Sequence, residues 1–206
     1  KLFSQRGYGG SPGGLIKVTQ YSRQLFQVES DTRITGLRIE GADTAYNTCA
    51  DGNTYCQPPA SGIIDYGNHS NVVVDNNEIY GWSDAAVKVR EGSHNARIHH
   101  NYMHNNRRRG LGYGVDFEGS DGVVYANLFN RGRHAVTAGG QPGTSYEASW
   151  NIALGDWNVD MPVFDMHADP PSVRDGSGHG GTWIKIHHNS LYYSRGSTGA
   201  PGVSII

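Results

Sequence analysis

The sequence predicts an all-β chain that folds as a parallel β-helix, a solenoid of about six turns. Three observations predict this fold. Short β-rich segments recur along the 206 residues, one Asn recurs at the same place in each copy, and patterns typical of helices are nearly absent. A chain of this length is sufficient for one such domain.

The repeat becomes visible when five segments are aligned on one Asn. The segments are NVVVDNNEIYGW (71–82), NARIHHNYMHNN (95–106), GVVYANLFNRGR (122–133), SYEASWNIALGD (145–156) and WIKIHHNSLYYS (183–194). The aligned residues are Asn77, Asn101, Asn127, Asn151 and Asn189. A period of roughly 22 to 27 residues suits turns that stack at about 4.8 Å. A leucine-rich repeat would need a Leu ladder, which is missing, and a β-propeller would need units of about 40 residues.

The recurring Asn has a physical role in such a fold. Asn tolerates the left-handed backbone angles of a tight bend, so we expect it to turn the chain between strands. Stacked Asn side chains can also form hydrogen bonds from one turn to the next. An earlier, degenerate copy of the repeat, RITGLRIEG, carries Leu37 in the Asn place.

Two insertions interrupt the repeat. Residues 42–61 hold Cys49 and Cys56 in a polar loop, and their close spacing favours a local disulfide over two free thiols. A disulfide indicates an oxidising compartment, so we expect a secreted or extracellular protein. Residues 168–181 form a second, Pro/Gly-rich insertion.

The final segment, PGVSII, is expected to be a strand with Val203 and Ile205 directed inward. The terminal turn of a solenoid needs a cover, because an open strand edge favours association. We therefore expect residues 1–206 to form one β-helix domain within a longer β-helix, or to be covered at the C-terminal end by another copy of the chain.

A further strand follows the Asn bend in each turn and carries a polar face. The candidate strands are AAVKVRE (85–91), GYGVDFE (112–118), RHAVTAG (133–139), PVFDMHA (162–168) and GVSII (202–206). Alternation places Val87 and Val89 inward and Lys88 outward. Applied to each strand, it predicts an outer stripe of Lys88, Arg90, Asp116, Glu118, Thr137, Asp165, His167 and Ser204. A long polar stripe suits an extended polymer.

The loops that flank the stripe are expected to add Arg109, Tyr113, Arg131, Arg133, His134, Tyr146 and Glu147. The candidate catalytic residues are Tyr113, Asp116, His134, Asp165 and His167. The candidate substrate-binding residues are Lys88, Arg90, Arg109, Glu118, Arg133, Tyr146 and Glu147. Polar residues on the outer face of a strand are ordinary surface in many proteins. The residue type changes at every turn, however, which favours a site over a structural repeat.

These repeats resemble the right-handed parallel β-helix repeat proteins, a superfamily that includes pectate and alginate lyases, polygalacturonases and mannuronan epimerases. The resemblance covers residues from about 26 to 206, and its Asn repeat is specific for the fold rather than for the reaction. It implies a single-stranded right-handed parallel β-helix that acts on a polysaccharide.

The first functional hypothesis is β-elimination or epimerisation of a uronic-acid polymer, which begins with removal of the C5 proton. The uronate carboxylate would be neutralised by Lys88, Arg109 or Arg133. The base or acid would be Tyr113, His134 or His167. The segment VFDMHAD also resembles the epimerase motif Tyr-Gly-Phe-Asp-Pro-His-Asp/Glu. It matches at Phe164, Asp165 and His167 and departs at Pro162, Val163 and Met166, with the acidic residue one place late at Asp169.

The second hypothesis is glycoside hydrolysis by paired carboxylates. Asp116 and Asp165 lie two turns apart, about 9.6 Å by the strand spacing, near the window of inverting enzymes. Glu118 and Glu147 are alternative partners. The third is a non-catalytic, polysaccharide-binding or structural β-helix.

Composition limits the other classes of partner. The net charge is −2, which offers no general attraction for nucleic acid. The sequence contains no apolar run of 18 or more residues, so no membrane span is expected. No zinc site is expected at the cysteines, because no second Cys or His pair lies near them. The cofactor is left open: calcium remains an option, since Asp116, Glu118 and Asp165 offer oxygen ligands.

Overall fold

The computed structural model describes residues 1–20, 22–42, 59–108, 110–154, 162–167, 180–192 and 203–205, with residues 203–205 described by their backbone alone. Several expectations fall outside these residues: those for Arg109, Asp169, the Cys49–Cys56 disulfide, most of the 168–181 insertion, and the inward side chains of Val203 and Ile205.

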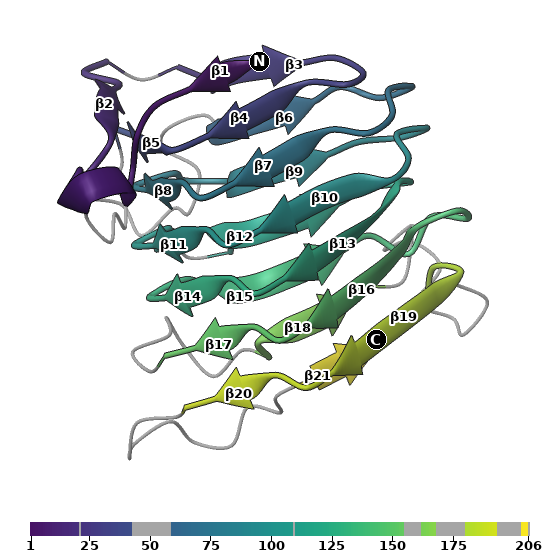
Figure 1. The fold of residues 1–206 in the computed structure, drawn as a ribbon. Helices are drawn as coiled ribbons and strands as arrows, with labels where there is room; N and C mark the ends of the chain where they lie inside the picture. Colours follow the sequence, from purple (N-terminus) through teal and green to yellow (C-terminus); the bar gives the residue numbers. More distant parts are fainter. Residues whose placement is uncertain are drawn as a thin grey trace, which may run out of the picture.

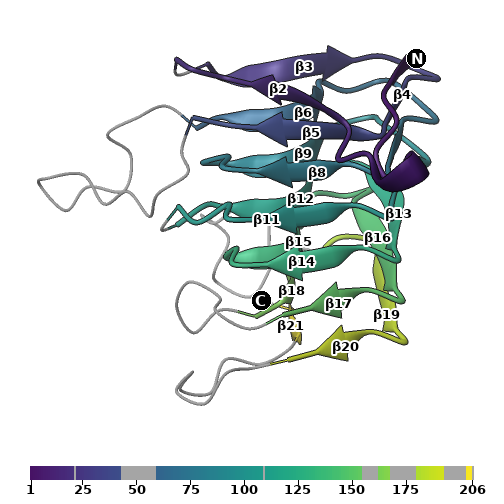
Figure 2. The ribbon, with the colours of Figure 1, turned by 60° about the vertical axis from the view of Figure 1, so that its left-hand side comes forward.

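Each turn contributes one strand to each of three parallel sheets, so the chain is a three-sided solenoid, as Figure 1 and Figure 2 show. Sheet A contains β1 (Leu2–Phe3), β4 (Arg33–Thr35), β7 (Val73–Asp75), β10 (Ala96–His99), β13 (Asp121–Tyr125), β16 (Ser145–Ser149) and β19 (Trp183–His187). Sheet B contains β2 (Gly14–Lys17), β5 (Leu37–Glu40), β8 (Glu78–Tyr80), β11 (Tyr102–His104), β14 (Leu128–Asn130), β17 (Ile152–Ala153) and β20 (Ser190–Leu191). Sheet C contains β3 (Gln24–Val28), β6 (Ser61–Asp65), β9 (Ala85–Val89), β12 (Tyr113–Phe117), β15 (His134–Ala138), β18 (Phe164–Met166) and β21 (Val203–Ile205).

The pairing of the strands confirms the parallel β-helix. Within each sheet a strand pairs in parallel with the strands of the neighbouring turns; in sheet C, for example, Val115 lies between Val87 and Val136. The described residues form seven strands in each sheet rather than about six turns. The additional turn is β1, β2 and β3, which precedes the first recognisable repeat. Two strands follow each Asn bend instead of one, because a short strand of sheet B comes before the strand of sheet C.

The predicted Asn ladder joins successive turns between sheets A and B. In Asn101, for example, Oδ1 accepts hydrogen bonds from the backbone N–H and the side-chain amide of Asn77 at 3.0 and 3.1 Å. The left-handed backbone angle, however, belongs to the residue before each ladder Asn, such as His100 (φ 54°) and Ala126 (φ 53°). The ladder Asn is therefore selected for its buried amide and not for its backbone.

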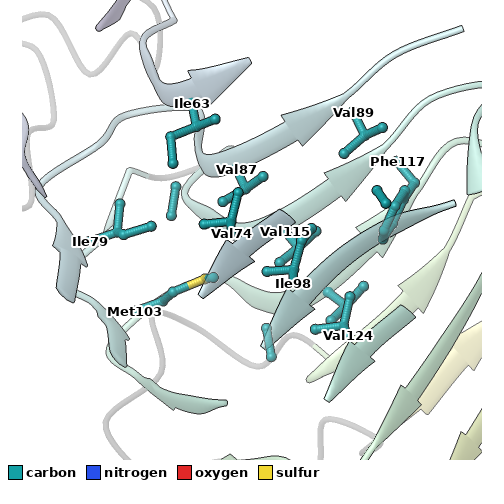
Figure 3. Packing of buried hydrophobic residues seen from close by; sticks show 14 of the residues in the cluster. Ile63, Val74, Ile79, Val87, Val89, Ile98, Met103, Val115, Phe117 and Val124 are labelled. Atoms are coloured by element: carbon teal, nitrogen blue, oxygen red, sulfur yellow. The ribbon is translucent and has the colours of Figure 1, made fainter. Parts of the chain in front are cut away.

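The interior is filled by apolar side chains from all three sheets. Figure 3 shows part of this core, with Ile63, Val74, Ile79, Val87, Ile98, Met103, Val115 and Val124 gathered between the sheets. Each such burial contributes about 1.5–3 kcal/mol relative to exposure. The core therefore holds the three sheets in a fixed arrangement and makes sheet C a rigid support for side chains on its outer face.

Regular helix is scarce in the described residues, which include one 3-10 helix, η1 (Tyr8–Gly10). No helix found among them has the length and apolar character needed to cross a membrane.

Candidate active site

The outer stripe of sheet C is assembled as predicted, but several of its members are buried. Cα pairing places Lys88 beside Asp116, and Asp116 beside Thr137. The exposed fraction is 8% for Lys88, 5% for Asp116 and 0% for Asp165. The polar side chains of successive turns pack against one another, so these groups are partly or wholly removed from water.

His134 is the first residue of strand β15 and not part of a flanking loop. An irregularity in this strand turns its side chain outward. The backbone N–H groups of Ala135 and Val136 both approach the carbonyl of Val163, at 2.8 and 3.3 Å, and both side chains lie in the core. Two successive inward residues are the mark of a β-bulge. The bulge shifts the alternation by one residue, which places His134 on the outer face.

The same irregularity brings Tyr113 to the outer face. A Cβ atom built on Gly114 would lie 2.6 Å from the ring of Phe129 in the interior, so Gly114 and the core residue Val115 both face inward. The ring of Tyr113 stacks on that of His134, with centroids 5.5 Å apart. Strict alternation from Val115 would have buried Tyr113 in the core.

Lys88 lies at the centre of a cluster of three carboxylates. Its Nζ is 2.9 Å from Asp116 Oδ2, 3.1 Å from Glu118 Oε1 and 3.3 Å from Asp84 Oδ2. Glu118 also pairs with Arg90 at 3.2 Å. Lys88 is thus committed to protein carboxylates, which leaves little of its charge for a substrate anion.

The cluster shifts the pKa values of Asp116 and Lys88. Burial raises the pKa of Asp116 to about 7, and the negative charges of Glu118 and Asp84 act in the same direction, against the attraction of Lys88. Burial alone would lower the pKa of Lys88, but the surrounding carboxylates raise it, so the lysine keeps its charge. Near neutral pH a substantial fraction of Asp116 is therefore protonated beside these neighbours.

Two turns along the stripe, Asp165 contacts two imidazoles. Its Oδ2 lies 2.5 Å from Nε2 of His167 and 3.7 Å from Nε2 of His134. Nδ1 of His134 lies 2.5 Å from the carbonyl of Pro162, which can only accept, so this nitrogen carries the proton. Burial lowers the pKa of His134 to about 4, so its imidazole is neutral. His167 is the accessible member, with 42% of its side chain exposed.

Two adjoining cavities lie along this face. A cavity of about 210 Å³ is lined by Lys88, Asp116, Thr137 and His167, among others. A second, of about 320 Å³, extends toward the N-terminal turns, past Arg90 to Tyr66 and Arg23. Both are lined by Asp84, Lys88 and Leu111, so they meet at the lysine cluster. We call the two together the sheet C groove.

Arg133 makes its contacts with neighbouring residues of the protein. Its guanidinium donates hydrogen bonds to the carbonyl of Gly110 and to the hydroxyl of Tyr113, the latter at 3.1 Å, and lies over the Tyr113 ring. These contacts support Tyr113, and Arg133 does not line either cavity of the groove.

Tyr146 and Glu147 were expected in loops beside the stripe, and both positions are wrong. They lie in β16 of sheet A, where alternation turns Tyr146 into the core and Glu147 outward on a different side of the solenoid. Tyr146 stacks on Phe117, and Glu147 pairs with Lys185 and His187. Neither side chain reaches the sheet C groove.

Asp84, Leu111 and Gln141 line the groove but were not identified from the sequence. Asp84 precedes β9, where alternation no longer applies, and its side chain reaches Lys88 four residues later. Its backbone carbonyl also accepts from the N–H groups of Gly112 and Tyr113. An acidic residue just before a strand that carries an outward lysine is the signal that would have indicated it.

The family model described as "Right handed beta helix region" matches residues 13–147, more than half of the chain. The chain belongs to the right-handed β-helix family. Searches of curated proteins and of solved structures found no significant match. The matched segment of this right-handed β-helix contains the lysine cluster and His134, whereas Asp165 and His167 lie beyond it. Membership establishes the handedness of the solenoid and leaves the reaction to be argued from the groove.

Proposed function

We propose that this right-handed β-helix is a carbohydrate-active enzyme that hydrolyses glycosidic bonds in an extended polysaccharide bound along the sheet C groove. The observation that carries the proposal is the buried Asp116, which faces the groove with a pKa of about 7 beside carboxylates that are paired with cations. A protonated carboxylic acid next to an ionised one is the arrangement that glycosidases use.

The shape of the groove suits a polymer. Its two cavities meet at Lys88 and extend from Tyr66 at one end to His167 at the other. The strands beneath run from β6 to β18, four spacings of about 4.8 Å, or roughly 19 Å. Tyr66 is 44% exposed and offers an aromatic face for a sugar ring.

Asp116 is the general acid in this proposal, and Glu118 is its ionised partner. Both approach the same Lys88 Nζ, at 2.9 and 3.1 Å, so these two oxygens can be no further apart than the sum of those distances. That limit lies below the roughly 6.5 Å at which inverting enzymes begin and favours the retaining geometry. Asp116 would protonate the leaving oxygen while Glu118 attacks the anomeric carbon. Water would then release the sugar from Glu118.

This assignment differs from the pairing of Asp116 with Asp165 that the strand spacing suggested. Asp165 is fully buried and does not line the cavity, because His167 lies between it and the groove. Asp165 therefore acts through the imidazole that it contacts at 2.5 Å.

The charge of the groove favours a neutral polymer over a polyuronate. At the centre of the groove Lys88 contacts Asp84, Asp116 and Glu118. Arg90 pairs with Glu118, so both cations are engaged by protein carboxyl groups rather than free to hold a substrate carboxylate. A neutral or weakly charged polysaccharide avoids repulsion from this cluster. We also propose that the protein is secreted, because the predicted disulfide between Cys49 and Cys56 requires an oxidising compartment.

Removal of the C5 proton from a uronate is the second candidate. It is favoured by the Asp165–His167 pair, in which a buried carboxylate orients an accessible imidazole that lines the cavity. A histidine held in this way is a common general base. This reaction would need an added cation at the substrate carboxylate, and calcium could supply it.

The test is turnover on a panel of neutral and uronic-acid polysaccharides. Hydrolysis releases reducing ends, whereas elimination also creates an unsaturated sugar with its own ultraviolet absorbance. We expect reducing ends without that absorbance, and we expect Asp116→Asn to abolish them. Glu147→Gln, a carboxylate on the other side of the solenoid, is the matched control and should keep full activity. An unsaturated product would favour the second candidate, and binding without turnover would favour a non-catalytic β-helix.

A further inference from the structure

We propose that His134, Asp165 and His167 form a binding site for one divalent transition-metal ion of the Zn²⁺ type. This proposal does not depend on the reaction assigned to Asp116, and it adds metal ligands to the site residues predicted from the sequence, among which none was assigned.

The three side chains already gather their donor atoms. One nitrogen from each imidazole and one carboxylate oxygen all lie within 4.8 Å of one another. The His167 and His134 Nε2 atoms lie 2.5 and 3.7 Å from Asp165 Oδ2. A tetrahedral ion with bonds of about 2.0–2.1 Å needs donor atoms about 3.3 Å apart. Side-chain shifts of about 1 Å would satisfy that geometry without moving the strands.

Two buried acceptors at this cluster have no hydrogen-bond partner. They are Nε2 of His134 and Oδ1 of Asp165, both on side chains that are almost completely buried. Unpaired buried acceptors each cost about 1–3 kcal/mol. Nε2 of His134 lies 3.7 Å from Oδ2 of the same carboxylate, and these two acceptors have no proton to share, because the proton of His134 is on Nδ1. A cation between them would satisfy both.

The surrounding residues hold the donors as the outer shell of a metal site does. The carbonyl of Pro162 accepts from Nδ1 of His134, which fixes the tautomer and directs the Nε2 lone pair toward Asp165. Metal-bound histidines commonly make this type of hydrogen bond. The hydroxyl of Tyr146 donates to the backbone carbonyl of Asp165 at 3.1 Å and fixes β18 from the core side. The orphan Oδ1 of Asp165 therefore belongs to a residue whose backbone is held in place.

The donor set selects the kind of ion. Two imidazoles and one carboxylate suit Zn²⁺ and its first-row neighbours, whereas calcium takes six to eight oxygen ligands. Three protein ligands leave a coordination position open. Of the three proposed ligands, His167 lines the sheet C groove.

The experiment is a titration of chelator-treated protein with ZnCl₂, followed by isothermal titration calorimetry, and with CoCl₂, followed by visible absorption. We expect one ion per chain and saturable Co²⁺ bands. His167→Gln removes one donor from a side chain that is 42% exposed, so it should fold normally and weaken Zn²⁺ affinity by at least about 10-fold. Its thermal midpoint in the presence of chelator should equal that of the wild type.

His187→Gln is the matched control, because His187 also contacts a carboxylate, Glu147, at 3.0 Å, but belongs to sheet A. It should bind Zn²⁺ as the wild type does. The proposal is overturned if the wild type binds no ion, if His167→Gln binds with unchanged affinity, or if both variants lose affinity equally through scattered surface histidines. The readout is binding, so a failure of the hydrolase assignment would leave this result unaffected.

Discussion

Asp116→Asn should abolish activity and, at the same time, stabilise the protein at alkaline pH. Burial holds the folded-state pKa of Asp116 near 7, above its ordinary value of 3.8. The charged groups that face it are Lys88, Asp84 and Glu118, and His167 lines the same cavity. A carboxyl with a raised folded pKa contributes stability that is fully present below its unfolded pKa and is lost as the pH rises through its folded pKa.

The size of the effect follows from the two pKa values. They differ by about 3 units, and each unit corresponds to about 1.4 kcal/mol, so ionising Asp116 in the folded protein costs about 4 kcal/mol at pH 8. The cost develops between pH 3.8 and about pH 7. Asparagine has nearly the same shape and cannot ionise. Asp116→Asn should therefore raise the thermal midpoint at pH 8 by about 10 °C and change it little near pH 4.

Differential scanning calorimetry at both pH values is the assay, with Asp75→Asn as a control of opposite sign. Burial would raise the pKa of Asp75, but hydrogen bonds from Arg33 hold it below its ordinary value. That group contributes stability above its unfolded pKa, so Asp75→Asn should lower the midpoint at pH 8. Our reasoning is refuted if Asp116→Asn lowers the midpoint at pH 8, or shifts it equally at both pH values.

Three further substitutions probe the solenoid. Asn101→Ala should lower the free energy of unfolding, measured by urea titration, by about 3 kcal/mol, because it leaves the buried N–H of Asn77 without its acceptor. The control Asn130→Ala, at a half-buried position, should stay within about 0.5 kcal/mol of wild type. Equal effects of the two substitutions would contradict the stabilising role of the Asn ladder. Phe164→Ala should cost about 3–5 kcal/mol by calorimetry, through a cavity in a fully buried position; a loss below about 1 kcal/mol would argue against tight packing there. Gly114→Ala should be destabilising in the same assay, since its Cβ would lie 2.5 Å from a backbone oxygen of the next turn; a neutral result would mean that the bulge is not as described.

The fold could be predicted because two of its determinants are periodic in the sequence. The recurring Asn marks each bend, and the pattern around Val87, Lys88 and Val89 identifies the strands of sheet C. Stacking of these strands was enough to bring Lys88 and Asp116 together on one face. Exposure could not be predicted in the same way, because it depends on how side chains of neighbouring turns pack against one another.

The errors in the site have local causes. Tyr113 and His134 were placed in loops, although both are strand residues that a bulge turns outward. The sequence carries little sign of such a bulge beyond small residues such as Gly114 and Ala135. Tyr146 was grouped with the loop residues although the repeat alignment already included it in SYEASWNIALGD, the segment that contains β16. The alternation of inward and outward residues has the same period of two in every strand, so it does not show which of the three sheets a strand joins.

The Asn ladder has a direction as well as a position. Each side-chain amide donates to the side-chain oxygen of the next turn, in the same sense, through Asn77, Asn101, Asn127, Asn151 and Asn189. The amide dipoles are therefore aligned head to tail along the solenoid axis, and each bond polarises the next. An amide in the middle of this row is strengthened from both sides, whereas one at an end is strengthened from one side only. Replacement of a ladder Asn by Ala should thus be most damaging at Asn127 and least damaging at the two ends. The aligned amides also give the solenoid an electric dipole along its axis.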